Sequence, residues 1–141
     1  MQGNDLPNEI LAVHTQERAA VGVPPLTWSE TLAASAQTWA LHLATLGEFK
    51  HSPDTSYGEK IVGYNLPVVY PHREGQSKWV EEKSKYVPGT PASRDTGHYT
   101  QLVVKQSTEV GCGTATGDGY PFSILVCQYL PPGNWNGKPP Y

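Results

Sequence analysis

The chain has 141 residues and a mass of 15.4 kDa, which is the size of one ordinary domain and leaves no room for a second. Its net charge of -3 and isoelectric point near 5.9, with scattered lysines and arginines, exclude the basic surface that a nucleic acid or an anionic membrane requires. No apolar run approaches the ~20 residues of a membrane span. We therefore expect one soluble globular domain over residues 1–141, and a monomer.

From the N-terminal region to the segment around His98, the regular parts of the sequence have apolar residues at intervals of three and four, as helices do. Ser29 precedes the longest such run as an N-cap, and Gly47 follows it as a stop signal. The first predicted helix lies within residues 8–23 and is ended by Gly22, the second runs between Ser29 and Gly47, the third covers residues 75–87, and a short fourth helix begins near His98. Prolines and glycines break every apolar run from Phe49 to Gly75, which predicts a long loop there.

The period changes from about 3.6 to 2 after the fourth helix. Residues 107–116 and 122–130 alternate as the two arms of an antiparallel hairpin. Because helices come first and paired strands last, we expect an α+β fold in which helices cover an antiparallel sheet. The Pro- and Gly-rich residues 131–141 are predicted to wrap the surface of the same domain.

The two cysteines, Cys112 and Cys127, stand one in each arm of the predicted hairpin. A disulfide between them would close a loop of about 15 residues, contribute roughly 3 kcal/mol and place the protein in an oxidising compartment. Two buried free thiols are the alternative. The first residues have neither the basic end nor the apolar stretch of a signal peptide, so we expect the mature form of a secreted, extracellular or periplasmic protein with an added Met1.

The sequence lacks the short motifs H-E-x-x-H, G-x-S-x-G, the P-loop, G-x-G-x-x-G and C-x-x-C. What remains is "HSPDTSYGE" beginning at His51, "GHYTQ" around His98, and the acidic "WVEEK" of the third helix. Imidazoles and carboxylates bind zinc, and they also act as acids and bases near neutral pH. Spacing alone does not choose between these roles, and a lone histidine is more often structural.

Several ordered segments together resemble the CAP superfamily of cysteine-rich secretory proteins, antigen 5 and plant pathogenesis-related protein 1. "GHYTQLV" with "VGCG", and "CQYLPPGNWNGKPPY", resemble its two signature segments. "VHTQERAAVGVPPLTW", "HSPDTSYGE" and "WVEEK" precede them in the order that the family has. The likeness runs from about Glu9 to Tyr141 and implies a three-layer α-β-α sandwich around a central antiparallel sheet.

The resemblance also implies a central cleft lined by two histidines and two acidic residues. These match His51, Glu59, Glu82 and His98. The histidines would be ligands of a divalent metal, zinc by preference, with the carboxylates as further ligands or as hydrogen-bonding support. Glu59 and Glu82 are also the candidate acid–base residues if the cleft is catalytic.

Three neighbours of these residues complete the expected site. Tyr99 and Gln101 would support the cleft by pinning the short helix that carries His98. Lys60 stands where the family motif has an asparagine. Because an inward ammonium would weaken cation binding, we expect the Lys60 side chain to point outward.

Residues 60–74 carry more apolar side chains than a solvated loop needs. The candidates to line a groove for a sterol or a fatty acid, as family members are reported to do, are Ile61, Tyr64, Val68, Val69 and Tyr70. The alternative is that this segment folds back onto the domain.

The resemblance favours a secreted binding or effector protein over an enzyme, because no nucleophile, oxyanion motif or substrate-pocket signal is present. One alternative is a metal-dependent hydrolase that uses the same His/Glu cleft. Another is a precursor that releases a C-terminal signalling peptide. The expected partners are a divalent metal and a small apolar ligand, and not a nucleic acid or a membrane.

Overall fold

A computed structural model describes residues 6–46, 50–53, 57–64, 71–91, 93, 95–115 and 123–132, with the side chains of all of these except 62–64 and 71–75. In chain order the elements are α1 (Leu6–Ala20), β1 (Thr27–Trp28), α2 (Glu30–Leu46), β2 (Gly58–Tyr64), α3 (Pro71–Glu81), the 3-10 helix η1 (Glu82–Lys85), α4 (Gly97–Val103), β3 (Glu109–Ala115) and β4 (Ser123–Leu130). None of the described helices is long and apolar enough to cross a bilayer.

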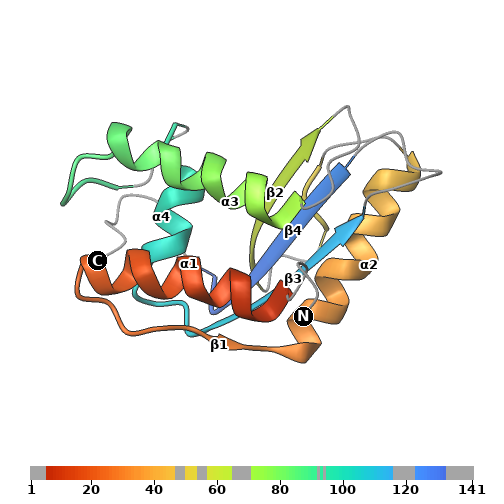
Figure 1. Cartoon of the computed structure of the whole chain (residues 1–141), viewed down its shortest axis with the longest axis horizontal. Helices are drawn as coiled ribbons and strands as arrows, with labels where there is room; N and C mark the ends of the chain where they lie inside the picture. Colours follow the sequence, from red (N-terminus) through yellow and green to blue (C-terminus); the bar gives the residue numbers. More distant parts are fainter. Residues whose placement is uncertain are drawn as a thin grey trace.

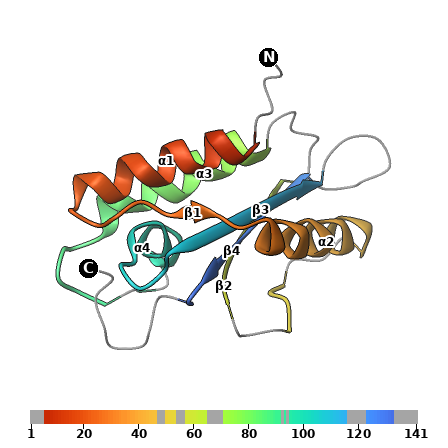
Figure 2. The ribbon, with the colours of Figure 1, turned by 90° about the horizontal axis from the view of Figure 1, so that it is seen from below.

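The strands form one sheet in the order β1-β3-β4-β2, with β1 parallel to β3 and the other neighbours antiparallel. Helix α2 covers one face, whereas α1, α3 and α4 cover the other (Figures 1 and 2). The expected three-layer α-β-α arrangement is therefore confirmed. The strand β2 lies at one edge of this sheet, which matters for the site below.

Each face of the sheet has its own apolar core. The alternate residues Cys112, Leu125 and Cys127 pack beneath α1, α3 and α4, together with Trp79 and other buried side chains. Ala115, Ile124 and Val126 point the other way and pack against the small and branched residues of α2. Since successive side chains of a strand leave opposite faces, this division follows from the sheet's pairing register.

The predicted disulfide is present. Cys112 of β3 and Cys127 of β4 stand directly opposite each other in the register and are bonded. They are the only cysteines of the chain, so no free thiol remains.

Two glycines of β3 allow α2 to lie directly on the sheet. A Cβ at Gly111 would sit 2.6 Å from the carbonyl carbon of Leu32, and one at Gly113 would meet the backbone of Gln37. The Gln37 side chain then reaches Thr114, donating from Nε2 to its carbonyl (2.8 Å) and accepting from its N–H (3.0 Å). A side chain at either glycine would force the helix away from the sheet.

The buried Arg18 joins α1 to the end of α4. Its guanidinium donates to four backbone carbonyls, those of Pro24 (2.6 Å), Leu102 (3.2 Å), Val104 (2.9 Å) and Ser107 (3.0 Å). Burial lowers the pKa of Arg18 to about 10, which still leaves the group charged at neutral pH. The role of Arg18 cannot be recognised in the sequence, because all four groups that accept its hydrogen bonds are backbone carbonyls and no acidic partner marks the site.

The helices and the β3–β4 hairpin lie close to their predicted positions, but the prediction of a loop from Phe49 to Gly75 was wrong. Strand β2 occupies Gly58–Tyr64, and α3 begins at Pro71, upstream of the predicted start. The glycines and prolines in this region resemble loop punctuation. Pairing with β4, whose residues lie 59 to 71 positions further along the chain than their partners, is what makes β2 a strand.

Candidate functional site

Glu82 and His98 form the first half of the site. Glu82 opens η1, immediately after α3, and its Oε1 accepts the backbone N–H groups of His98 (2.9 Å) and Tyr99 (3.0 Å) at the start of α4. Its Oε2 lies 2.7 Å from Nδ1 of His98. The carboxylate therefore fixes both the backbone and the ring of His98, and it leaves Nε2 without a hydrogen bond to any described residue.

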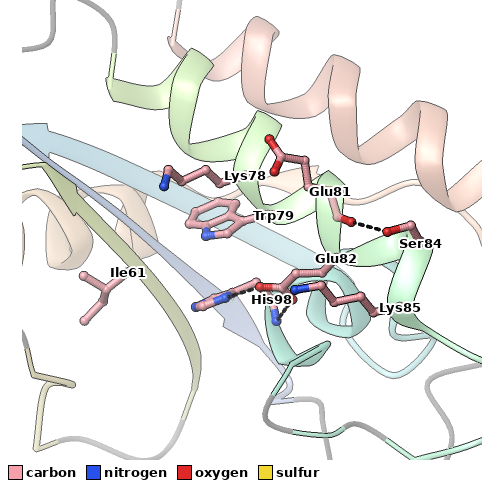
Figure 3. A pocket seen from close by; sticks show the side chains of 8 residues that line it. All are labelled: Ile61, Lys78, Trp79, Glu81, Glu82, Ser84, Lys85 and His98. Atoms are coloured by element: carbon pink, nitrogen blue, oxygen red, sulfur yellow. Dashed lines mark hydrogen bonds and ion pairs between the residues drawn. The ribbon is translucent and has the colours of Figure 1, made fainter.

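A cavity of about 460 Å³ opens beside this pair (Figure 3). Trp79 forms part of its wall and lies nearly parallel to the His98 ring, with centroids 6.0 Å apart and planes 18° apart. The lining residues are Ile61, Lys78, Trp79, Glu81, Glu82, Ser84, Lys85 and His98. Figure 3 shows Ile61, from β2, facing Trp79 and His98 across the opening.

His51 and Glu59 form the second half of the site. Nδ1 of His51 lies 2.9 Å from Oε1 of Glu59, which also accepts the N–H of Ser52 (2.8 Å). Oε2 of Glu59 accepts a hydrogen bond from Nε2 of Gln128, its cross-strand neighbour (2.8 Å). Sequence reasoning missed Ser52 and Gln128, because only the pairing of β2 with β4 places the amide beside Glu59.

Electrostatics couples these two residues. The hydrogen bond to Glu59 raises the pKa of His51, against the effect of partial burial. Burial acts to raise the pKa of Glu59, but its hydrogen bonds from His51, Ser52 and Gln128 together lower it. The Glu59 carboxylate is only 6% exposed, whereas the His51 side chain is 68% exposed. The pair thus combines a fixed, buried anion with an imidazole that solvent reaches.

The edge strand β2 separates the two halves. Glu59 and Lys60 are consecutive, so their side chains leave opposite faces of the sheet. Glu59 lies with Gln128 on the α2 side, whereas Lys60 lies with His98 on the α3 and α4 side. Within the described part of the chain, no three His, Cys, Asp or Glu side chains come together as a metal-binding group. The structure therefore presents two His–carboxylate pairs in place of one joint cluster.

Lys60 points inward, and the expectation that it points to solvent was wrong. The residue is 1% exposed, its Nζ lies 4.0 Å from the Trp79 ring centroid and 5.2 Å from that of Tyr129, and it donates to the carbonyl of His98 (3.3 Å). Burial lowers the pKa of Lys60 well below its usual value, although the Glu82 carboxylate acts to raise it. A lysine in a loop can turn its side chain to solvent. In a paired strand successive side chains point to opposite faces, so Lys60 points beneath α3 because Glu59 points to the other face.

Tyr99 and Gln101 lie on the buried side of α4. Tyr99 is 1% exposed and packs at a tilt against Tyr86, with ring centroids 5.7 Å apart. Gln101 is 2% exposed and donates from Nε2 to Oγ of Ser107 (3.0 Å), which in turn donates to the carbonyl of Pro131. Both residues hold α4 against the core, and neither lines the cavity.

Of the apolar ligand candidates, Ile61 lines the cavity. Tyr64 is the last residue of β2, but its side chain lies outside the described part of the structure, as do Val68, Val69 and Tyr70. The C-terminal residues 133–141, which the peptide-precursor hypothesis concerns, also lie outside it.

The fold and site define a class of protein: a mainly antiparallel sheet covered by helices on both faces, with two histidine–carboxylate pairs beside its edge strand. Residues 11–129 match the model of the CAP family, described as the cysteine-rich secretory protein family. The chain belongs to this family.

Curated relatives are similar over nearly the whole chain. It is 35% identical to a pathogenesis-related protein of PR-1 type from Sambucus nigra, over 96% of this chain and 81% of that protein. It is 36% identical to pathogenesis-related protein 1A from Nicotiana tabacum, over 94% of this chain and 79% of that protein. These likenesses support the family membership independently of the structure.

Solved structures share the fold at lower identity. The crystal structure of NaASP2 with Zn²⁺ matches 100% of this chain and 86% of its own, with a TM-score of 0.79 and 20% identity. The hookworm platelet inhibitor matches 99% of this chain and 76% of its own, with a TM-score of 0.78 and 18% identity. Both comparisons bear on the fold alone.

Proposed function

We propose that this chain is an extracellular binding protein whose cleft takes up a divalent cation, zinc by preference, through imidazole nitrogens of His98 and His51. The observation that carries this proposal is the same at both residues: a carboxylate engages Nδ1 and leaves Nε2 without a described partner. Carboxylates that hold the far nitrogen of a histidine are the usual support of zinc-binding imidazoles. The zinc-containing structure of the similar protein NaASP2 is consistent with this chemistry.

The structure also bears on how tightly such a cation would bind. Two imidazoles on either side of an edge strand are fewer ligands than a closed structural zinc site has. Lys60, when protonated, would add repulsion beneath His98. The proposal is therefore for a modest, exchangeable site, with the solvent-exposed His51 reached from the open edge of β2.

Secretion and a small apolar ligand complete the proposed function. The cystine and the membership of a secretory family support an oxidising, extracellular location. Trp79 gives the cavity beside His98 an apolar wall, and Ile61 lies at its rim while packing against the core on the α2 side, which supports a ligand with an aliphatic part such as a fatty acid or a sterol.

Calorimetric titration with zinc tests the metal site. We expect His98→Ala and His51→Ala each to weaken binding at pH 7.5 by about tenfold or more, and lowering the pH to 5.0 to weaken it further, because only neutral imidazole binds metal. His42→Ala is the histidine control, since this imidazole stacks on Trp39 of α2 and is not among the residues that line the cavity. Equal affinity of the wild type and His98→Ala would refute the proposal.

A further inference from the structure

A second hollow, which we call the α1–α3 groove, lies between those two helices. Figures 1 and 2 both show α1 and α3 side by side. The groove has a volume of about 630 Å³, and its described lining consists of Glu9, Ala12, Val13, Gln16 and Glu17 from α1 and Gln76, Ser77, Val80 and Glu81 from α3. It is distinct from the cavity beside His98, because Lys78 and Trp79 face that cavity from the other side of α3 and Glu81 alone of the described residues lines both.

The floor of the α1–α3 groove is apolar. Ala12 and Val13 come from α1, and Val80 comes from α3. Ala12 is exposed, whereas Val13 and Val80 are half-buried, so solvent still reaches this apolar strip. A strip of this kind between two helices that lie side by side is the surface that a third helix covers when an amphipathic helix docks in a groove.

The rim of the groove is acidic. Glu9, Glu17 and Glu81 line it, and none of the described lining residues is a lysine, an arginine or a histidine. Nζ of Lys83 lies 3.1 Å from Oε1 of Glu17, so among these described residues three carboxylates and one ammonium leave a net charge of −2. A field of this sign attracts a cationic partner and repels an anionic one, including the carboxylate of a fatty acid.

The acidic residues lie at the two ends of the apolar strip. Glu9 and Glu17 are eight residues apart in α1, which corresponds to about 12 Å along the helix. Glu81 ends α3 and lies near Glu17, because Lys83, two residues later, pairs with Glu17. A complementary partner therefore has an apolar face and positive charges about two helical turns apart.

We propose that the α1–α3 groove docks a basic amphipathic helix of a partner protein. The apolar face of that helix lies on Ala12, Val13 and Val80, and its lysines or arginines meet the carboxylates at the two ends of the groove. Charge complementarity selects this occupant over an acidic helix or an anionic lipid. The inference goes beyond the proposed metal and small-ligand binding, and it concerns a different face of α3.

Titration of the full chain with a designed peptide tests the proposal. The probe is a fluorescently labelled helix of about 15 residues that contains only leucine and lysine, with the leucines at intervals of three and four. One comparison peptide has glutamate in place of every lysine, and the other has glutamine in place of every leucine. In EDTA and about 0.15 M salt, we expect the anisotropy to show saturable one-to-one binding of the leucine–lysine peptide and at least tenfold weaker binding of both comparison peptides.

Matched pairs of variants locate the binding on the protein. Ala12→Lys places a cation on the exposed floor of the groove and should weaken binding at least tenfold, whereas Ala34→Lys makes the same change at an exposed position of α2 and should change the affinity less than twofold. Glu81→Gln should weaken binding about two- to fivefold, as expected for one exposed charge. Glu30→Gln, which removes an exposed carboxylate of α2, is its control and should have no such effect.

Each result decides the question. Equal effects of Ala12→Lys and Ala34→Lys would overturn the proposal, because binding would then depend only on the net charge of the protein. Equal binding of the lysine and glutamate peptides would overturn it too, since the groove would then select only for apolar surface. If circular dichroism shows that Ala12→Lys does not fold, equal affinities of Glu81→Gln and Glu30→Gln refute the site. Absence of peptide binding with intact zinc binding refutes this inference alone, whereas the reverse pattern refutes the metal proposal alone.

Discussion

Replacing Arg18 by methionine should strongly destabilise the protein, because four buried or partly buried carbonyls then lose their donor. The carbonyls belong to Pro24, Leu102, Val104 and Ser107. A hydrogen bond from a charged donor contributes about 1.5–3 kcal/mol, but such contributions are not additive and some carbonyls can take up water. We therefore expect a loss of about 3–5 kcal/mol, which is less than the four contributions added together.

Urea denaturation followed by tryptophan fluorescence measures this loss. With a dependence of about 1.5–2 kcal/mol per molar urea, the midpoint should fall by roughly 2 M. Arg18→Lys should lie between the wild type and Arg18→Met, because an ammonium keeps the charge but offers three donors from one atom. Lys105→Met removes an exposed cation and should change stability by less than about 0.5 kcal/mol. A loss below about 1 kcal/mol for Arg18→Met would show that the four contacts do not hold α1 to α4.

Three further results are expected. Gly113→Ala should prevent α2 from packing on β3 and lower the free energy of unfolding, measured by urea denaturation, by at least about 3 kcal/mol. Gly97→Ala has open space around the added Cβ and should lower it little. Equal effects of the two substitutions would contradict the close packing of α2 on β3. The coupling energy of His51 and Glu59 in a double-mutant cycle should be largest between about pH 4.5 and 6.5, where both groups are charged. The raised pKa of His51 adds stability that is lost as the pH rises through the pKa of the folded state. The lowered pKa of Glu59 adds stability that is lost as the pH falls through the pKa of the folded state. A coupling that is flat from pH 3 to 9 would rule out the ion pair. Reduction of the single disulfide should lower the free energy of unfolding by roughly 3 kcal/mol, and an unchanged denaturation midpoint in reductant would show that the bond does not restrict the unfolded chain.

Local patterns in the sequence were enough to predict most elements of the fold. Helix α2 follows from its apolar spacing, and Ser29 caps it as expected, accepting the N–H of Leu32 at 3.1 Å. The β3–β4 hairpin was predicted from two strand-like segments joined by a turn-rich stretch, which also placed Cys112 and Cys127 within reach of each other. These features depend on neighbours a few residues apart, or on two strands joined by one turn.

The candidate site was predictable only as a set of residue types. The family resemblance identified His51, Glu59, Glu82 and His98, but not which histidine binds which carboxylate. The pairs that form, across 8 and 16 residues, depend on where η1 and β2 lie relative to α4. Trp79 belongs to the "WVEEK" segment of the predicted third helix, but its position against His98 required the packing of α3 on α4.

The sequence by itself determined the family, the main helices and hairpin, and the residues from which the site is built. The tertiary structure alone decided that Gly58–Tyr64 is an edge strand, that Lys60 is buried beneath Trp79, and that the two His–carboxylate pairs lie on opposite sides of that strand. The physical reason is the same in each case. Pairing with β4 fixes the register of β2, and the register fixes the face to which every side chain of the strand points.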